Sequence, residues 1–143
     1  MSEVKLSTDG IRYMALFESL TGAMVMDCFE DSENNRLIFV VKSGDMGLAI
    51  GKGGDHINRV RNIIGKHIEI VEHSDDPVEF VKNAFHPVSI KNVNIVLRDD
   101  KCIAYVEVHT KEKGLAIGRD GKNIEKVRRL SARHHNIDDV IIQ

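Results

Sequence analysis

Cysteine is scarce in this sequence of 143 residues, and the scarcity excludes two classes of small protein. Only Cys28 and Cys102 occur, each within an apolar stretch. Disulfide scaffolds and zinc modules need more cysteines, or cysteine and histidine at short spacing. The adjacent His134 and His135 do not supply a chelating pair, because neighbouring residues on a helix point to different faces. We expect buried, reduced thiols in strands, no metal site and no cofactor.

Long apolar runs are also missing. No stretch approaches the roughly 20 residues that span a bilayer. Residues 1–10 lack the charged and then apolar pattern of a secretory signal. With 42% apolar and 29% charged residues, the composition is that of a globular protein with a packed core. We therefore expect a cytoplasmic protein that makes no membrane contact.

An excess of positive charge is absent overall, since the formal net charge is −2, but the charges are unevenly distributed. Residues 47–67 contain four Lys or Arg against one Asp, which sums to +3. Residues 113–135 contain seven Lys or Arg against Asp120 and Glu125, which sums to +5. Basic patches attract polyanions even when the whole chain is acidic. A nucleic-acid ligand is therefore compatible with this sequence.

The two basic blocks are copies of one unit. Residues 47–54 read GLAIGKGG, and residues 114–121, which lie 67 positions later, read GLAIGRDG. The shared register continues without a gap through Ile57 and Ile124, Val60 and Val127, Arg61 and Arg128, and His67 and His134. A match of this length indicates a duplicated structural unit. We assign a first domain to residues 1–75 and a second domain to residues 76–143.

Both copies show the same order of predicted elements: strand, strand, helix, glycine turn, helix and strand. Runs rich in β-branched residues precede each glycine turn, and apolar residues at helical spacing follow it. The predicted strands are residues 24–30, 36–42 and 68–71 in the first copy, and 88–98, 101–110 and 140–142 in the second.

A further helix is predicted ahead of each pair of strands, because capping and helix-stopping residues bracket an apolar pattern of helical period. The residues that indicate its ends are Thr8 and Gly22 in the first copy, and Asp75 or Asp76, Pro77 and Pro87 in the second. The connector at about residues 73–77 is too short for a flexible linker. We expect the domains to pack rigidly and to share one binding surface.

The glycine turn has a structural and a functional interpretation. Gly51 is expected to end the first helix in a left-handed conformation, from which the backbone bends into the second helix. In the functional interpretation, the missing side chains let a sugar-phosphate backbone approach, and the amides at the new helix start attract a phosphate. Lys52 and Arg119 add positive charge. Repetition of the turn in a basic, strand-flanked context favours the functional interpretation.

A helix, a G-x-x-G turn and a second helix, packed on a three-stranded sheet, resemble the core of the K homology (KH) family of RNA-binding domains. The helix and strand ahead of this core resemble the type II form found in prokaryotic KH proteins. The resemblance covers nearly the whole chain. It implies an α+β fold of two tandem type II KH domains, each a three-stranded mixed sheet packed by helices.

Two stretches are similar to the NusA family of transcription termination and antitermination factors. They are the paired GLAIG segments at residues 47–51 and 114–118, and residues 76–87, which match the D-P-x-E-F-x-x-N-A-x-x-P join between that family's KH domains. Bacterial NusA carries a polymerase-binding domain and an OB-fold domain ahead of its KH pair. Neither is found here, so the chain resembles the short archaeal form. The resemblance implies binding of single-stranded RNA, with RNA polymerase or a transcription complex as a further partner. We expect the chain to be a monomer.

The resemblance places the RNA backbone along the two turns and the bases in a shallow groove beside them. Asp120 puts a carboxylate where a phosphate would pass, so it should weaken the second turn unless Arg119 or Lys122 draws it away. The expected RNA-binding residues are Gly51, Lys52, Gly53, Gly54 and Arg59 in the first copy, and Gly118, Arg119, Asp120, Gly121, Lys122, Lys126 and Arg129 in the second.

A basic stripe is a further hypothesis for the second copy. Its members fall at helical spacing and would track phosphates, although Glu125 can pair with Arg129 and make this an ordinary solvated face. The stripe consists of Lys122, Lys126, Arg129 and Arg133.

Aromatic side chains are few, with no Trp, two Tyr and five Phe, and this argues against base stacking of the RRM or OB-fold kind. Backbone hydrogen bonds and aliphatic contacts would then recognise the bases. The aliphatic candidates are Ile50, Ile57, Ile117 and Ile124, all of which also suit a core.

Three other functions fit parts of the pattern. A KH factor in ribosome assembly or RNA processing would share every motif above. A helix-turn-helix DNA binder would use Asn58, Arg59, Arg61 and Asn62 as readers, but it needs none of the predicted strands. An enzyme is not expected, because neither turn has P-loop spacing and no nucleophile is paired with a base.

Overall fold

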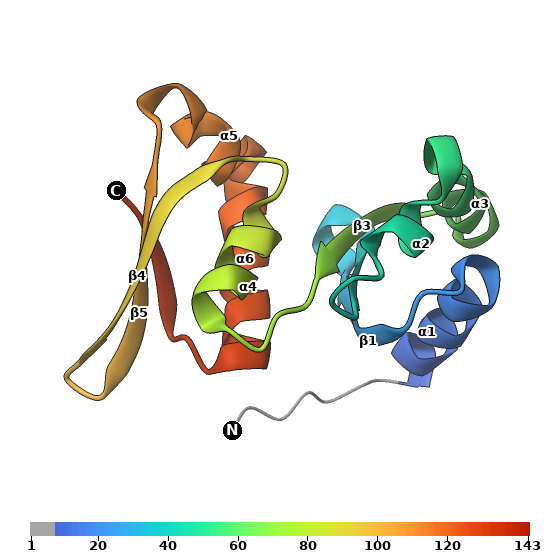
Figure 1. Cartoon of the computed structure of the whole chain (residues 1–143), viewed down its shortest axis with the longest axis horizontal. Coiled ribbons are helices and arrows are strands. Elements are labelled where there is room, and N and C mark those ends of the chain that lie inside the picture. The colour runs from blue at the N-terminus through green and yellow to red at the C-terminus, as the bar shows by residue number, and fades with distance from the viewer. Residues whose placement is uncertain (1–7) are drawn as a thin grey trace. The chain divides into compact units, whose positions relative to one another are not determined.

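The computed structural model describes residues 8–143, which form two compact units, residues 8–74 and 75–143 (Figure 1). The first unit contains α1 (Thr8–Thr21), β1 (Val25–Asp31), β2 (Arg36–Val41), α2 (Met46–Ile50), α3 (Asp55–Ile64) and β3 (His67–Glu72). The second contains α4 (Pro77–Phe85), β4 (Ile90–Arg98), β5 (Lys101–Val108), α5 (Lys113–Ile117), α6 (Lys122–His135) and β6 (Asp139–Ile142). The predicted order of elements is confirmed in both copies.

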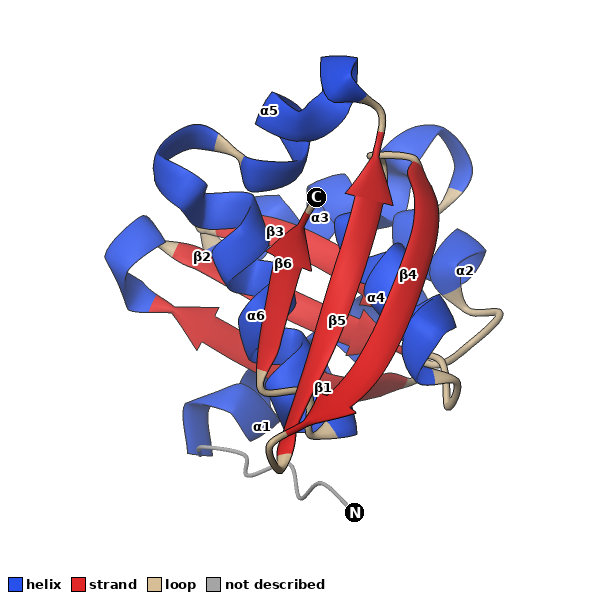
Figure 2. Ribbon diagram, turned by 90° about the vertical axis from the view of Figure 1, so that its left-hand side faces the viewer, coloured by secondary structure: helices blue, strands red, loops and turns tan. Residues whose placement is uncertain are grey.

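Each unit has one mixed three-stranded sheet (Figure 2). The strand orders are β1-β2-β3 and β4-β5-β6. In each, the first two strands are antiparallel, and the second and third are parallel. A parallel neighbour requires a crossover, which the two helices around the glycine turn provide. The predicted α+β class with mixed sheets is therefore confirmed.

The helix that opens the second unit begins and ends as its sequence predicts. Asp76 is the N-cap of α4, and its side chain accepts a hydrogen bond from the amide of Val78 at 3.3 Å. Pro77 occupies the first helical turn, where its missing N–H costs nothing. The helix ends at Phe85, and a cis peptide bond joins His86 to Pro87.

Two predicted strands are shorter in the structure by two residues each. β4 starts at Ile90 because the chain turns first, with the amide of Val88 donating to the carbonyl of Phe85 at 2.9 Å. β5 ends at Val108 because a 3-10 turn, Thr110–Glu112, leads directly into α5. Both differences lie at strand ends, where local turns compete with the β pattern.

The core of the first unit lies between the helices and one face of the sheet. Leu37, Phe39 and Val41 alternate along β2 and point toward α1 and α3. The rings of Phe17 and Phe39 pack at a centroid distance of 4.4 Å. Burying one such ring stabilises the fold by about 1.5–3 kcal/mol relative to leaving it in water. This packing fixes the positions from which the first glycine turn begins and ends.

In the second unit, α4 and α6 lie side by side on one face of the sheet (Figure 1). The ring of Phe80 packs against the imidazoles of His134 and His135, at centroid distances of 5.2 and 5.0 Å. These two histidines therefore serve packing. Among the described residues, no group of three or more His, Cys, Asp or Glu could hold a metal ion.

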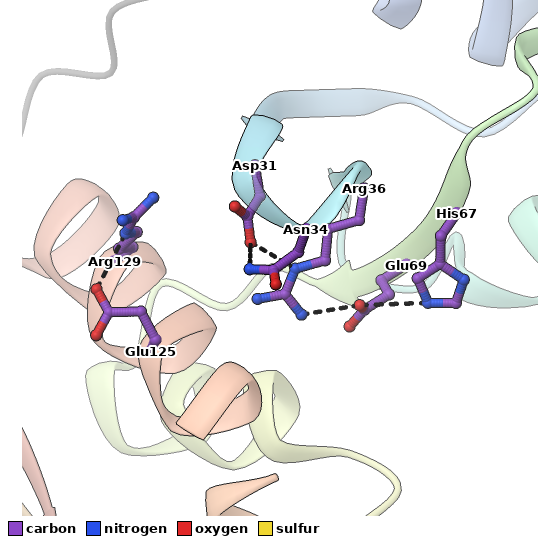
Figure 3. Close-up of polar contacts among 7 residues, drawn as sticks. All are labelled: Asp31, Asn34, Arg36, His67, Glu69, Glu125 and Arg129. Atoms are coloured by element: carbon purple, nitrogen blue, oxygen red, sulfur yellow. Dashed lines mark hydrogen bonds and ion pairs between the residues drawn. The ribbon is translucent and has the colours of Figure 1, made fainter. Parts of the chain in front are cut away.

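An ion-pair cluster ties the three strands of the first unit together (Figure 3). The guanidinium of buried Arg36 lies 2.8 Å from Asp31 and 3.0 Å from Glu69. Asn34 also donates to Asp31, at 2.8 Å. Burial alone would raise the pKa of Asp31, but the hydrogen bonds from Asn34 and Arg36 outweigh it and hold the pKa below the usual value.

Both cysteines are free thiols within strands, Cys28 buried in β1 and Cys102 half-buried in β5. No helix in the described part of the chain is both long and apolar enough to cross a membrane.

Candidate nucleic-acid interface

The first G-x-x-G turn joins α2 to α3 and is closed by short main-chain hydrogen bonds. The amide of Gly51 donates to the carbonyl of Gly47 at 2.8 Å, and that of Gly54 donates to Gly51 at 3.1 Å. Gly54 is the N-cap of α3, a helix of ten residues. The first amide of α3, that of Asp55, donates to the carbonyl of Lys52, and the amides after it have no partners within the helix, so this end of the turn can receive an anion.

The second turn repeats this geometry between α5 and α6. The amide of Gly118 donates to Gly114 at 2.9 Å, and that of Gly121 donates to Gly118 at 3.1 Å. The φ and ψ angles of Gly118, 80° and 169°, differ by no more than 5° from the 75° and 170° of Gly51. The duplication therefore extends to the backbone conformation of the turn itself.

The first glycine of each turn is not in the left-handed helical conformation that the sequence led us to expect. Gly51 has a positive φ, but its ψ of 170° is extended, in a region that is essentially restricted to glycine. A Cβ atom on Gly51 would lie 2.6 Å from Cγ of His56, and one on Gly118 would lie 2.8 Å from Cβ of Asn123. These glycines are required because the following helix packs directly against them.

At the same repeat position in each copy, a side-chain hydrogen bond joins the helix after the turn to the helix before it. Nδ1 of His56 donates to the carbonyl of Leu48 in α2 at 2.6 Å. The amide of Asn123, 67 positions later, donates to the carbonyl of Ala116 in α5 at 2.9 Å. His56 and Asn123 were not among the residues predicted from the sequence, although both are polar residues two positions after the last glycine of a turn.

The third residue of each turn has a left-handed backbone conformation and is exposed in both copies. Gly53 has φ 64° and ψ 19°, and a Cβ atom there would meet nothing within 4 Å. Asp120 has φ 55° and ψ 25°. Asp tolerates this conformation better than most residues do. The second turn thus keeps its shape while gaining a negative charge.

The middle residues of both turns present unpaired charges. Within residues 8–143, the ammonium of Lys52 and the guanidinium of Arg119 make no hydrogen bond or ion pair. The carboxylate of Asp120 has no such partner in that range either, so neither Arg119 nor Lys122 draws it away. All three groups are exposed and available to a ligand.

Many other charges of the basic blocks have partners. Arg59 pairs with Asp55 at 3.2 Å, and Arg129 pairs with Glu125 at 3.1 Å (Figure 3). Both pairs are exposed and four residues apart, so each is weak and open to exchange with a phosphate.

The equivalent residues Arg61 and Arg128 are structural in both copies. Each donates to a carbonyl of the strand that follows its helix, Ile68 at 3.4 Å and Val140 at 3.2 Å. Two of the positive charges counted in the basic blocks, residues 47–67 and 113–135, therefore stabilise the fold.

The predicted basic stripe on α6 is interrupted. Lys122 and Arg129 are exposed, but Lys126 retains only 5% of its accessible surface. It lies on the packed side of the helix, one turn before buried Leu130. The prediction of an unbroken row of exposed cations along this helix is therefore wrong, because Lys126 does not lie at the surface.

The four aliphatic candidates divide into two pairs. Ile50 and Ile117 are 41% and 43% exposed immediately before the turns, whereas Ile57 and Ile124 are buried in the cores. Leu48 and Leu115 are also exposed and were not selected from the sequence. An exposed aliphatic pair beside each glycine turn can contact bases without aromatic stacking.

Comparisons with known proteins match the fold and the sequence of both units. A family model for the KH domain matches residues 11–100, and one for the NusA-like second KH domain matches residues 77–141. Two curated proteins, both described as a probable transcription termination protein NusA, come from Halobacterium salinarum and Halococcus morrhuae. They are 39% and 41% identical to this chain over 137 residues, and each alignment covers 96% of both sequences. The crystal structure of APE1850 matches with a TM-score of 0.86 and 38% identity, covering 96% of this chain and 100% of that one.

Proposed function

We propose that this chain, which belongs to the NusA-like family of tandem KH-domain proteins, holds one single-stranded RNA at both of its G-x-x-G turns during transcription termination or antitermination. The observation that carries the proposal is the duplicated turn: two glycine cradles of the same conformation, each with an unpaired cation and a helix start. A single site would fit many anions, but a repeated one fits a repeating polyanion.

The residues of the first turn have separate tasks in this proposal. Gly51 and Gly54 let the sugar-phosphate backbone approach the start of α3, where main-chain amides donate hydrogen bonds to a phosphate. Lys52 supplies the countercharge. Ile50 contacts a base, because its exposed side chain lies directly before the turn.

The second turn contributes less to affinity. Arg119 takes the place of Lys52, but Asp120 brings an unpaired carboxylate to a place where the first turn has only a hydrogen atom. At about 4 Å and an effective dielectric constant near 20, one such charge costs on the order of 4 kcal/mol against an adjacent phosphate before screening by salt. The first turn therefore anchors the RNA and the second extends the contact.

We also infer the setting of this activity. The chain acts in the cytoplasm as a monomer, binds RNA without transforming it, and contacts RNA polymerase or another part of the transcription complex while the RNA is bound. The relatives described as transcription termination proteins support this setting. Residues 8–74 and 75–143 each contribute one turn to the binding of the same strand.

A binding comparison tests the proposal directly. The intact chain should bind a single-stranded RNA more tightly than a DNA duplex of the same sequence at one fixed salt concentration. Preference for the duplex would support the helix-turn-helix alternative and overturn this function. Equal affinity for both ligands would show that the basic turns bind polyanions without selecting single-stranded RNA, and it would overturn the proposal.

A further inference from the structure

A pocket of about 220 Å³ lies in the second unit, between the end of α4, the α4–β4 connection, the short helix α5 and the start of α6. Pockets for drug-sized ligands usually measure about 300–1,000 Å³, so this one suits a single planar ring system. Its walls are mainly apolar, with one carboxylate and one amide. The lining residues are Phe85, Pro87, Val88, Glu112, Leu115 and Asn123.

The pocket adjoins the second G-x-x-G turn. Asn123 lines it and is also the residue against which Gly118 packs, at 2.8 Å from the place of a Cβ atom. Leu115, three residues before Gly118, lines it with a side chain that is 67% exposed. A nucleotide whose phosphate rests on this turn therefore has the pocket within reach of its base.

Glu112 distinguishes this pocket from the first unit. At the equivalent repeat position, the carboxylate of Asp45 accepts a hydrogen bond from the amide of Met24 at 2.8 Å and so closes the connection between α1 and β1. The carboxylate of Glu112 makes no hydrogen bond or ion pair with any residue from 8 to 143. The α4–β4 connection beside it contains Pro87, which has no N–H to donate.

We propose that this Glu112 pocket binds one guanine base of an RNA strand that passes the second turn, an inference that rests on the proposed function. An ionised carboxylate only accepts hydrogen bonds and offers two oxygens side by side. Guanine presents two adjacent donors, N1–H and the 2-amino group. Adenine and cytosine place a ring acceptor beside their amino group, and uracil has no amino group. Leu115 and Pro87 cover the faces of the base.

The experiment uses the intact chain and a uridine-only RNA strand of fixed length, into which one guanosine is placed at successive positions. At one position the guanosine should tighten binding about fivefold or more, the discrimination expected of a two-bond base contact. Inosine at that position, which lacks the 2-amino donor, should lose most of the gain. Equal affinities for all strands would overturn the pocket and leave the proposed function standing, whereas failure to bind any strand would contradict the proposed function.

The variant Glu112→Gln separates a general electrostatic effect on RNA affinity from a specific effect on the guanosine preference. Removing a negative charge near RNA should tighten binding in general, but the proposal expects the guanosine preference to disappear while affinity for the uridine-only strand stays equal or rises. Glu33→Gln, an exposed acid in the first unit, is the charge-matched control and should keep the preference. Retention of the preference in Glu112→Gln would overturn the assignment.

A second variant and a crosslink guard against an indirect effect. Leu115→Ser alters an exposed wall residue without touching the core, so it should keep the melting temperature and lose the guanosine preference. Photoactivated 6-thioguanosine at the preferred position should crosslink to the segment of residues 112–123. A crosslink confined to the first unit would overturn the proposal.

Discussion

Nδ1 of His56 donates a hydrogen bond of 2.6 Å to the carbonyl of Leu48, which joins the helix after the first glycine turn to the helix before it. In the second copy Asn123 makes the equivalent bond one residue further along, to Ala116. The imidazole reaches one residue farther back than the shorter amide does. Both bonds satisfy a carbonyl near the end of a short helix, and both link the two helices on either side of the turn.

Because the hydrogen bond from His56 to Leu48 links the two helices, we expect His56→Ala to weaken RNA binding by a few fold and His56→Asn to leave it unchanged. A lost intramolecular hydrogen bond of this kind costs about 0.5–1.5 kcal/mol. Asparagine restores the donor that the second turn already uses. RNA affinity and thermal melting should be measured for both variants, and equal losses in the two would show that the imidazole acts in some other way.

Gly51 and Gly53 should respond very differently to substitution, although both have positive φ. Gly51→Ala should destabilise the first unit by roughly 3 kcal/mol, because the conformation is nearly exclusive to glycine and the new Cβ collides with His56. Gly53→Asp should cost about 1 kcal/mol or less, since Asp120 adopts the same conformation in the second turn. Chemical denaturation of both variants checks this order, which a similar loss for the two would contradict.

The double variant Lys52→Asp with Gly53→Asp should lose more than tenfold in RNA affinity, or about 1.4 kcal/mol, while remaining folded. It removes an unpaired cation and places two carboxylates on the phosphate path. Arg119→Asp is the matched control, because it gives the second turn the same pair of aspartates in one step. It should lose less affinity, since Asp120 already weakens that turn, and an equal or larger loss would show that the second turn is the main anchor.

Salt dependence should distinguish the unpaired cation from the paired one. The logarithm of affinity should fall with the logarithm of salt concentration by about 0.7 per phosphate neutralised on a single strand. Lys52→Met should reduce the magnitude of this slope by about 0.7, the value for one phosphate contact. Arg59→Met should reduce it less, because Asp55 already neutralises Arg59. Binding measured across a salt series would refute the cradle if the wild-type slope were zero.

The ion-pair cluster makes the stability of the first unit depend on acidity. The pKa of Asp31 is lowered in the fold, so the carboxylate adds stability above its unfolded value of about 4, and this stability is lost as pH falls through the folded pKa. Arg36→Met should destabilise the unit by about 3–5 kcal/mol at neutral pH, because it leaves Asp31 buried without its cation. Asp31→Asn should flatten the stability profile below pH 4, and an unchanged acid profile would contradict this account.

The sequence predicted the order of elements, the sheet type and the family well, because the repeat allowed each pattern to be read twice. It could not place side chains that lie near one another only in three dimensions. Spacing alone put Lys126 on an exposed stripe, but packing turned it toward buried Leu130. The residue Glu112 looked like any surface acid, and only the contrast with the hydrogen-bonded Asp45 showed that its carboxylate is unengaged. Likewise, the positive φ of Gly51 was foreseeable from the turn, whereas its extended ψ depends on how α3 packs.

The left-handed Asp120 has a kinetic consequence for the bound strand. Two linked contacts break one at a time, and the weaker contact opens first. In the proposed binding mode, a strand held by both turns leaves the second unit while the first still holds it, and it can rebind there before it is lost. Release then has a fixed direction along the RNA, set by a single carboxylate, and Asp120→Gly would slow departure from that end without altering the backbone of the turn.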